Sequence, residues 1–286
     1  GGGTDYPGWY KEHGGAVIST SINKYCYITC RELPPFFDCN YRIRYRQHEE
    51  VMTVAEIQHP SVRACLTYVS MPYGIEMQHN ADVPGMAGLG SSSAFTVGFL
   101  HALYALIGRD ITKYQLARDA IHVEQNIIKE NVGSQDQTAC SFGGFNKIEF
   151  GGDEQIHVTP IPMDGERLRE LQKHLMLIFT RFPRNASEVA GEQIQTMKDR
   201  YNELMHMRQL VDEAYKVFTS SSVSLDEVGR LLHETWMLKR SLTSRITSPF
   251  IDEVYEAARC AGALGGKLLG AGGGGFMLFY VRPEAQ

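Results

Sequence analysis

The sequence lacks the features that mark membrane proteins, disordered chains and nucleic-acid-binding proteins. No apolar run approaches the ~18 residues of a membrane span. Lys and Arg number 28 against 33 Asp and Glu, a formal net charge of −5, so there is no basic excess to bind a nucleic-acid backbone. With 43% hydrophobic and 21% charged residues, the composition is that of a globular protein. We therefore expect neither a membrane nor a nucleic acid as a partner.

Common metal and nucleotide motifs are missing as well. The six cysteines form no CxxC pair and the ten histidines form no HExxH. This excludes the usual zinc patterns and favours the reduced thiols of a cytoplasmic protein. The Walker A pattern GxxxxGK[ST] is absent, so a P-loop nucleotide site is not predicted. Nothing in the sequence defines an oligomeric state.

Hydrophobic periodicity predicts a mixture of strands and helices. Strands are expected over 16–22, 24–30, 41–46, 144–150, 155–161, 175–180 and 276–281. Helices are expected over 61–70, 92–107, 112–128, 187–219, 224–242 and 251–261. This loose alternation predicts an α+β protein. The stretch 160–165 is the expected boundary between two domains, residues 1–162 and 163–286.

The 28 glycines are clustered, and one cluster directly precedes a predicted helix. Residues 82–94 read DVPGMAGLGSSSA. Glycines at a helix N-terminus let the backbone N–H groups approach an anion, and the helix dipole favours negative charge there. The three serines add hydroxyl groups. We interpret the segment as a phosphate-binding loop; the alternative is a turn with a serine N-cap.

A second glycine cluster, 270–275, lies close to the other end of the chain. It formally satisfies GxGxxG, but the strand pattern FMLFYV follows it instead of a helix, so a dinucleotide fold is not predicted. Four consecutive glycines are entropically unfavourable unless something packs very close to them. We expect the loop to press against another backbone or a phosphate; the alternative is a tight structural turn.

Two carboxylates follow the first glycine loop. Glu124 falls on the same helical stripe as Ala117, Ile121 and Ile128, where a carboxylate is costly unless it is paired or bound to a cation. Asp136 lies in GSQDQ, which we interpret as a polar turn. Near a phosphate loop, one carboxylate suits Mg²⁺ and the other a hydroxyl proton. The alternative is a helix-face Glu and a turn Asp.

Four segments together resemble the GHMP kinases, a family that includes galactokinase and the homoserine, mevalonate and phosphomevalonate kinases. GGGTD at 1–5 is similar to the end of the family's first motif, and PGMAGLGSSSA at 84–94 resembles the second. VGSQDQ at 132–137 resembles the segment carrying the catalytic aspartate in galactokinase-like members, and GALGGKLLGAGGGGF at 262–276 resembles the third motif. The resemblance implies a two-domain α+β fold. Its N-terminal domain would have left-handed βαβ character, its C-terminal domain would be ferredoxin-like, and the active site would lie between them.

The resemblance also implies roles for individual residues. Asp136 would take or orient the proton of the acceptor hydroxyl, and Glu124 and Ser92 would bind Mg²⁺. The phosphates of ATP would contact Gly85, Gly88, Leu89, Gly90, Ser91, Ser92 and Ser93. The sugar would contact Gly3, Asp5, Asp136, Gly272, Gly273 and Gly274. Arg184 and Lys239 are candidates for holding a substrate phosphate, because both side-chain types bind phosphate; the alternative is solvated helix-face charges.

Within the family, several stretches are most similar to the heptose 7-phosphate kinases, among them RNASEVAGEQI at 184–194. This implies ATP-dependent phosphorylation of the anomeric hydroxyl of D-glycero-D-manno-heptose 7-phosphate to the 1,7-bisphosphate, for nucleotide-heptose synthesis. The alternatives are another sugar kinase of the family, acting on galactose, fucose or a mannose derivative, and a non-catalytic nucleotide- and sugar-binding regulator. The first motif begins upstream in these kinases, so we expect a first strand, and a C-terminal segment, to lie outside this sequence.

Overall fold

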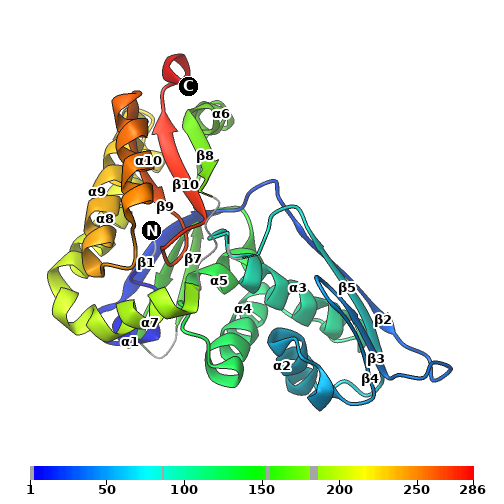
Figure 1. The fold of residues 1–286 in the computed structure, drawn as a ribbon. Coiled ribbons are helices and arrows are strands. Elements are labelled where there is room, and N and C mark those ends of the chain that lie inside the picture. The colour runs from blue at the N-terminus through cyan, green and yellow to red at the C-terminus, as the bar shows by residue number, and fades with distance from the viewer. Residues whose placement is uncertain (1–2, 86, 153–154, 181–185) are drawn as a thin grey trace.

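The computed structural model describes residues 3–85, 87–152, 155–180 and 186–286. Within these ranges the chain forms three sheets, with helices packed around them (Figure 1). Arg184, a predicted phosphate ligand, lies outside the described residues. The α+β prediction is confirmed.

Two of the three sheets are antiparallel and have three strands each. The first has the order β1-β6-β7, with β1 at Gly15–Thr20, β6 at Phe145–Phe150 and β7 at Ile156–Pro160. The second has the order β8-β10-β9, with β8 at Leu175–Phe179, β9 at Ala263–Leu268 and β10 at Phe276–Val281.

The third sheet is mixed, with the order β2-β5-β3-β4. Its strands are β2 at Cys26–Glu32, β3 at Tyr41–Arg44, β4 at His48–Val51 and β5 at Ile75–Ala81. Strands β3 and β5 run parallel, and the other pairs are antiparallel. This sheet lies at one end of the molecule in Figure 1, whereas the sheet containing β10 lies toward the other.

Every segment predicted to be helical is helical, but the helices over 7–13, 135–142 and 165–174 were not predicted, and two predicted helices are interrupted. The helices are α1 Pro7–His13, α2 Pro60–Val69, α3 Ser91–Leu106, α4 Lys113–His122, α5 Gln135–Phe142, α6 Gly165–His174, α7 Ala186–Thr196, α8 Tyr201–Thr219, α9 Asp226–Leu242 and α10 Pro249–Cys260. The predicted helix 187–219 is divided by a 3₁₀ turn at Met197–Arg200. The predicted helix 112–128 changes into a π-helical turn at Val123–Ile128.

Helix ends coincide with capping residues in the sequence. The Thr112 hydroxyl accepts a hydrogen bond from the Gln115 N–H at 3.1 Å, so Thr112 is the N-cap of α4. The Asp164 carboxylate caps α6 in the same way, accepting the Glu166 N–H at 2.8 Å. Each cap satisfies an N–H that the helix itself leaves unbonded.

Three clusters of buried hydrophobic side chains hold these layers together, one of them around Leu171 of α6, Leu210 of α8 and Leu231 of α9. Residues of the β2–β5 sheet pack with α2, α3 and α4 around the buried side chains Ile43, Met77 and Phe99. A separate core joins Val17 of β1 and Ile148 of β6 to residues of α7 to α10 and of β9 and β10. It therefore includes side chains from both sides of the predicted boundary at residues 162 and 163, and that division stays a prediction.

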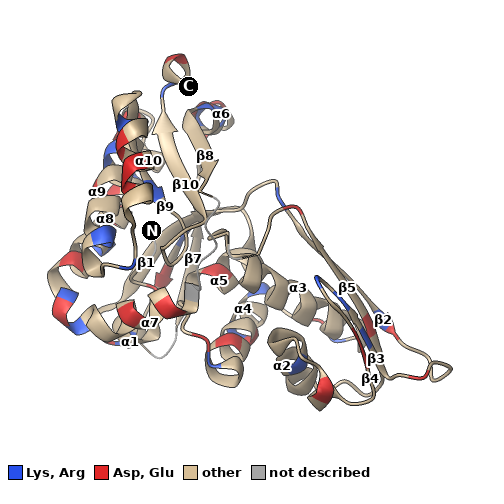
Figure 2. Ribbon diagram, in the orientation of Figure 1, with Lys and Arg blue, Asp and Glu red and all other residues tan. Residues whose placement is uncertain are grey.

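Acidic and basic side chains are interspersed along α8 to α10 and across the β2–β5 sheet (Figure 2). Opposite charges pair on that sheet; for example, the Arg42 Nε lies 2.8 Å from a Glu50 carboxylate oxygen. Exposed pairs of this kind add little to stability. Among the helices of the described residues, none is both long and apolar enough to cross a bilayer.

Candidate active site

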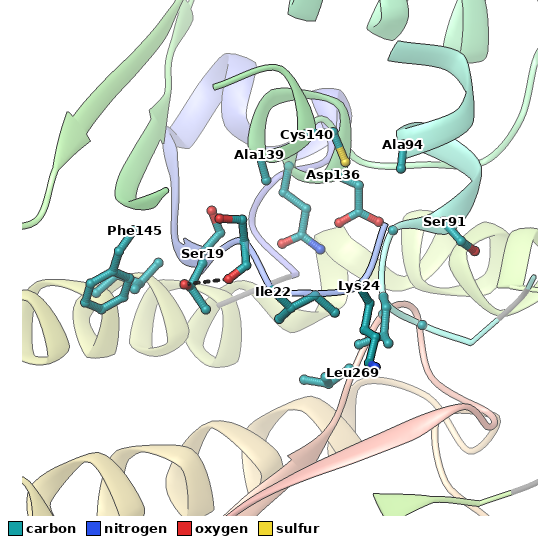
Figure 3. A pocket seen from close by; sticks show the side chains of 18 of the residues that line it. Ser19, Ile22, Lys24, Ser91, Ala94, Asp136, Ala139, Cys140, Phe145 and Leu269 are labelled. Atoms are coloured by element: carbon teal, nitrogen blue, oxygen red, sulfur yellow. Dashed lines mark hydrogen bonds between the residues drawn. The ribbon is translucent and has the colours of Figure 1, made fainter. Parts of the chain in front are cut away.

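A cavity of about 1450 Å³ opens beside the start of α3. Its walls include the first glycine loop, the first turns of α5, the segment between β1 and β2, and the beginning of the second glycine loop. Figure 3 shows Asp136 and Cys140 pointing into it from α5, with Ser91 and Ala94 on α3 and Lys24 and Leu269 on the facing segments.

The first glycine loop ends as the N-terminus of α3. Gly90 is the N-cap, at φ +72° and without a side-chain cap, so the first N–H groups of α3 have no side-chain partner at the cap. Such a helix end binds anions. Gly85, Gly88, Leu89, Gly90, Ser91 and Ser92 line the cavity. Ser93 is buried behind this wall. The arrangement suits a polyphosphate, as the sequence predicts.

The second glycine loop packs tightly against the first. A Cβ on Gly88 would lie 2.8 Å from the Leu269 carbonyl oxygen, and one on Gly270 would lie 2.8 Å from the Gly88 Cα. The Phe276 N–H also donates a hydrogen bond of 3.0 Å to the Ala87 carbonyl. The close approach predicted from the four-glycine run is therefore present, and the second loop braces the first.

The middle of the second glycine loop is buried, and it faces another segment of the chain. The Gly273 N–H donates to the Ile246 carbonyl at 2.8 Å, and a Cβ on Gly272 would lie 3.0 Å from the Ile246 Cα. Gly272 and Gly273 thus pack against the segment that precedes α10, and Gly274 follows them in the buried part of the loop. Their contact with the substrate stays a prediction.

Asp136 lies on the cavity wall at the start of α5. The prediction of a polar turn here is wrong: residues 135–142 are helical, and Asp136 occupies their first turn. A Cβ on Gly90 would lie 3.3 Å from the Asp136 carboxyl carbon, so a side chain at position 90 would displace the carboxylate from its present place. Burial raises the pKa of Asp136 to about 7, with additional effects from the Asp5 and Glu124 charges.

Glu124 lies in the π-helical turn and is 1% exposed. Its Oε2 accepts hydrogen bonds from the Ser93 hydroxyl at 3.0 Å and from the Gln137 amide. Burial raises the pKa of this carboxyl, and the hydrogen bonds from Thr96, Gln137 and Ser93 oppose the rise. The second oxygen, Oε1, is buried without a hydrogen-bond partner. An uncompensated carboxylate oxygen is what a cation would satisfy.

The described residues therefore fit Mg²⁺ at Glu124. They contain no cluster of three or more His, Cys, Asp or Glu side chains that could hold a metal by themselves. This agrees with the chemistry of Mg²⁺, which is bound by one or two carboxylates together with substrate phosphates. Ser92, the second predicted ligand, is exposed on the cavity wall, whereas its neighbour Ser93 bonds Glu124 directly. The role of Ser92 stays a prediction.

Asp5 lies behind the cavity wall, 2% exposed. Its carboxylate accepts the N–H groups of Gly3 at 2.9 Å and of Gln135 at 3.4 Å. The Gln135 contact connects the segment 1–5 to the segment 132–137, which contains Asp136. Gly3 and Asp5 thus support the site in the structure, and a direct contact with the sugar stays a prediction.

Two buried lysines lie near these carboxylates. Lys239 is 2% exposed and donates a hydrogen bond to the Gly270 carbonyl. Burial lowers its pKa to about 8, although the charges of Asp5 and Asp136 oppose the shift. Lys267, on β9, is 4% exposed and lines the cavity. Burial and the Lys239 charge lower its pKa to about 7.

Sequence reasoning missed Lys267 and Lys24, which both line the cavity. Lys267 immediately precedes the second glycine loop, in a strand that the periodicity did not predict. Its place in GGKLLG was the available signal. Lys24 had none, because it lies in the short segment between β1 and β2.

Comparison with known proteins identifies the family. Residues 56–144 match the sequence model of the GHMP kinase N-terminal domain, and residues 222–286 match that of the GHMP kinase C-terminal domain. The two matches together cover more than half of the chain. The chain belongs to the GHMP kinase family. It is accordingly a phosphotransferase that uses ATP.

The individual proteins to which the chain is similar are also named kinases. The chain is 27% identical over 296 residues to D-glycero-α-D-manno-heptose 7-phosphate kinase of Campylobacter jejuni, covering all of this chain and 87% of that protein. A D-glycero-D-manno-heptose 1-phosphate kinase of Bacteroides thetaiotaomicron has a similar structure, with a TM-score of 0.77 at 23% identity over 99% of this chain and 85% of that one. Lactococcus lactis galactokinase shares the fold at a TM-score of 0.75 and 17% identity, over 96% and 82% of the two chains.

Proposed function

We propose that the protein transfers the γ-phosphoryl group of ATP to the anomeric hydroxyl of a heptose phosphate, with the 7-phosphate as the expected substrate. The observation that carries the proposal is the placement of Asp136 on the cavity wall directly beside Gly90 of the phosphate loop. A carboxylate at this position lies where an acceptor hydroxyl would meet the terminal phosphate. The similarity to a named heptose 7-phosphate kinase over the whole chain supports the choice of sugar.

In this proposal, Asp136 accepts the proton of the acceptor hydroxyl while the oxygen of that hydroxyl attacks the γ-phosphorus of ATP. The bond from that phosphorus to the bridging oxygen breaks, and ADP leaves with the electron pair. A pKa of about 7 suits this step, because about half of the base is then ionised at neutral pH and the ionised form is basic enough to take a proton. The N-terminus of α3 holds the phosphates, and the buried lysines add positive charge nearby.

Mg²⁺, held by Glu124 with Ser92, would neutralise the charge of the phosphate oxygens. Lys239 is our candidate for contacting the substrate phosphate, and Arg184 is the other. In this proposal the nucleotide binds at the N-terminus of α3 and the metal binds beside the π-helical turn. The acceptor would lie on the side of α5.

A neutral hexose is the second candidate acceptor. It is favoured by the similarity to a plant fucokinase, 27% identical over 217 residues, although the match covers only 20% of that bifunctional protein. The names of the two heptose kinase relatives also differ in the position of the substrate phosphate. The substrate must therefore be tested both with and without a phosphate group.

An ADP-release assay across a panel of sugars tests the proposal. The panel contains heptose 7-phosphate, heptose 1-phosphate, unphosphorylated heptose, galactose, fucose and mannose, each with ATP and Mg²⁺. We expect heptose 7-phosphate to give the highest kcat/KM. Best turnover of an unphosphorylated hexose would contradict the substrate assignment. If the protein binds ATP but releases no ADP in the presence of any sugar of the panel, the result would favour a non-catalytic regulator.

A further inference from the structure

Gln193 is a buried polar side chain within the segment 184–194, and the proposed mechanism gives it no role. It lies on α7 and is 3% exposed. Its side-chain amide donates a hydrogen bond of 2.6 Å to the carbonyl oxygen of Ala271. Ala271 belongs to the second glycine loop, so a helix of the C-terminal half holds this loop by one directed contact.

The neighbouring carbonyl of the same loop is also held by a side chain. Lys239 of α9 donates to the Gly270 carbonyl. Gln193 and Lys239 therefore fix two successive carbonyl groups from two different helices. Gly270 and Ala271 are half-buried, and a carbonyl that is partly removed from water is destabilised when it loses its hydrogen-bond partner.

The loop so held presses directly on the phosphate loop. The Cβ positions of Gly88 and Gly270 would each come within 2.8 Å of the opposite backbone. Contacts this close transmit displacement, since packed backbones cannot interpenetrate. A shift of Ala271 would therefore move Gly88 and, with it, the N-terminus of α3.

We propose that Gln193 is a positioning residue for the phosphate loop. Its hydrogen bond to Ala271 keeps the second glycine loop seated on Gly88, and the start of α3 thereby keeps the geometry that binds the phosphates of ATP. The inference rests on the proposed function in one respect, namely that this loop binds ATP.

The test removes the hydrogen-bond donor and keeps the side-chain length. In Gln193→Met, we expect the Kd for Mg·ATP, measured by titration calorimetry on the full chain, to rise about tenfold. Amide hydrogen exchange of residues 87–93 and 269–275 should become faster in the ligand-free protein. Gln193→Glu is the second variant, because it keeps the shape but turns a carboxylate oxygen toward the Ala271 carbonyl; the same loss is expected at pH 8.

Two controls separate positioning from a general loss of stability. Tyr73→Phe removes another side-chain hydrogen bond to a backbone carbonyl, the 2.8 Å contact with Leu106 in a different core. Gln195→Met changes an exposed residue on the same helix. We expect Tyr73→Phe to lower the unfolding temperature and leave the Kd for Mg·ATP within twofold. Gln195→Met should change neither.

The inference is overturned if both Gln193 variants bind Mg·ATP within twofold of the wild type and exchange in residues 87–93 is unchanged. A wild-type protein that does not bind Mg·ATP would instead contradict the proposed function. The exchange comparison would then still decide on Gln193, because it needs no ligand.

Discussion

Asp136 and Glu124 are both carboxylates beside the start of α3, but Glu124 is buried whereas Asp136 is half-buried, and their surroundings differ. Glu124 is held by hydroxyl and amide donors on one oxygen and has a bare second oxygen. Asp136 faces the cavity beside Gly90, and the charges of Asp5, Glu124 and Lys239 affect its pKa. Fixed donors orient a carboxylate as a metal ligand, whereas charged neighbours adjust its proton affinity. The difference supports our proposal that Glu124 binds the cation and Asp136 takes the proton.

The largest expected effect is that of Asp136→Asn. An amide has the same shape but cannot take the acceptor proton, so kcat should fall by at least ~10²–10³. ADP release under saturating ATP and sugar measures the loss. The Kd for Mg·ATP should stay within a few-fold of the wild type. Undiminished turnover would show that Asp136 is not the base.

Glu124→Gln is expected to act on the cation. It removes the negative charge while keeping the hydrogen-bonding shape, and we expect the Mg²⁺ concentration for half-maximal rate to rise ~10–100-fold. The measurement is initial rate against Mg²⁺ at fixed ATP. A lower kcat with an unchanged Mg²⁺ requirement would contradict the metal assignment.

The pH dependence of activity should follow Asp136. Because the pKa of this carboxyl is raised to about 7, kcat/KM for the sugar should level off above pH 7. Below that value it should fall by about tenfold per pH unit as the base becomes protonated. A profile that stays flat from pH 5 to 8 would contradict the role of Asp136.

The same raised pKa affects folding with the opposite sign. Ionised Asp136 is disfavoured in the folded state, so its contribution to stability is present at low pH and is lost as the pH rises through about 7. Asp136→Asn should therefore become more stable relative to the wild type between pH 5 and pH 8. Thermal unfolding of both proteins at the two pH values measures this change.

The smallest effects separate two neighbouring serines. Ser92→Ala should raise the Mg²⁺ requirement, because Ser92 lies on the cavity wall as a predicted ligand. Ser93→Ala removes the 3.0 Å hydrogen bond to Glu124 and should lower the free energy of unfolding by ~1 kcal/mol. Chemical denaturation and Mg²⁺ titration of both variants provide the comparison. If both variants show the same Mg²⁺ requirement and the same free energy of unfolding, the proposal that Ser92 binds Mg²⁺ while Ser93 only orients Glu124 would be contradicted.

The sequence predicted the glycine loops and the two carboxylates because their chemistry is local. Glycines before a helix and a Glu on an apolar stripe can be recognised within about twenty residues. The helical position of Asp136 could not be recognised in this way, because the polar residues of GSQDQ are also typical of a turn. The α6 helix was missed although Asp164 caps it, since half of its ten residues are charged and only two are leucines.

Long-range contacts explain the remaining gaps. Gln193 and Ala271 are 78 residues apart, and only the packing of α7 on the second glycine loop brings them together. Lys267 and Asp136 share a cavity although they come from opposite halves of the chain. Strand β5 was also missed, because only its first four residues, IEMQ, alternate between apolar and polar side chains and polar residues follow them.

The central claim is that Glu124 serves the nucleotide and its metal while Asp136 serves the acceptor. Calorimetric titration of a non-hydrolysable Mg·ATP analogue into the wild type, Asp136→Asn and Glu124→Gln tests it most directly. The account predicts that Asp136→Asn binds the analogue within about threefold of the wild type, whereas Glu124→Gln binds it at least ~10-fold more weakly. Loss of binding in Asp136→Asn with full binding in Glu124→Gln would contradict it.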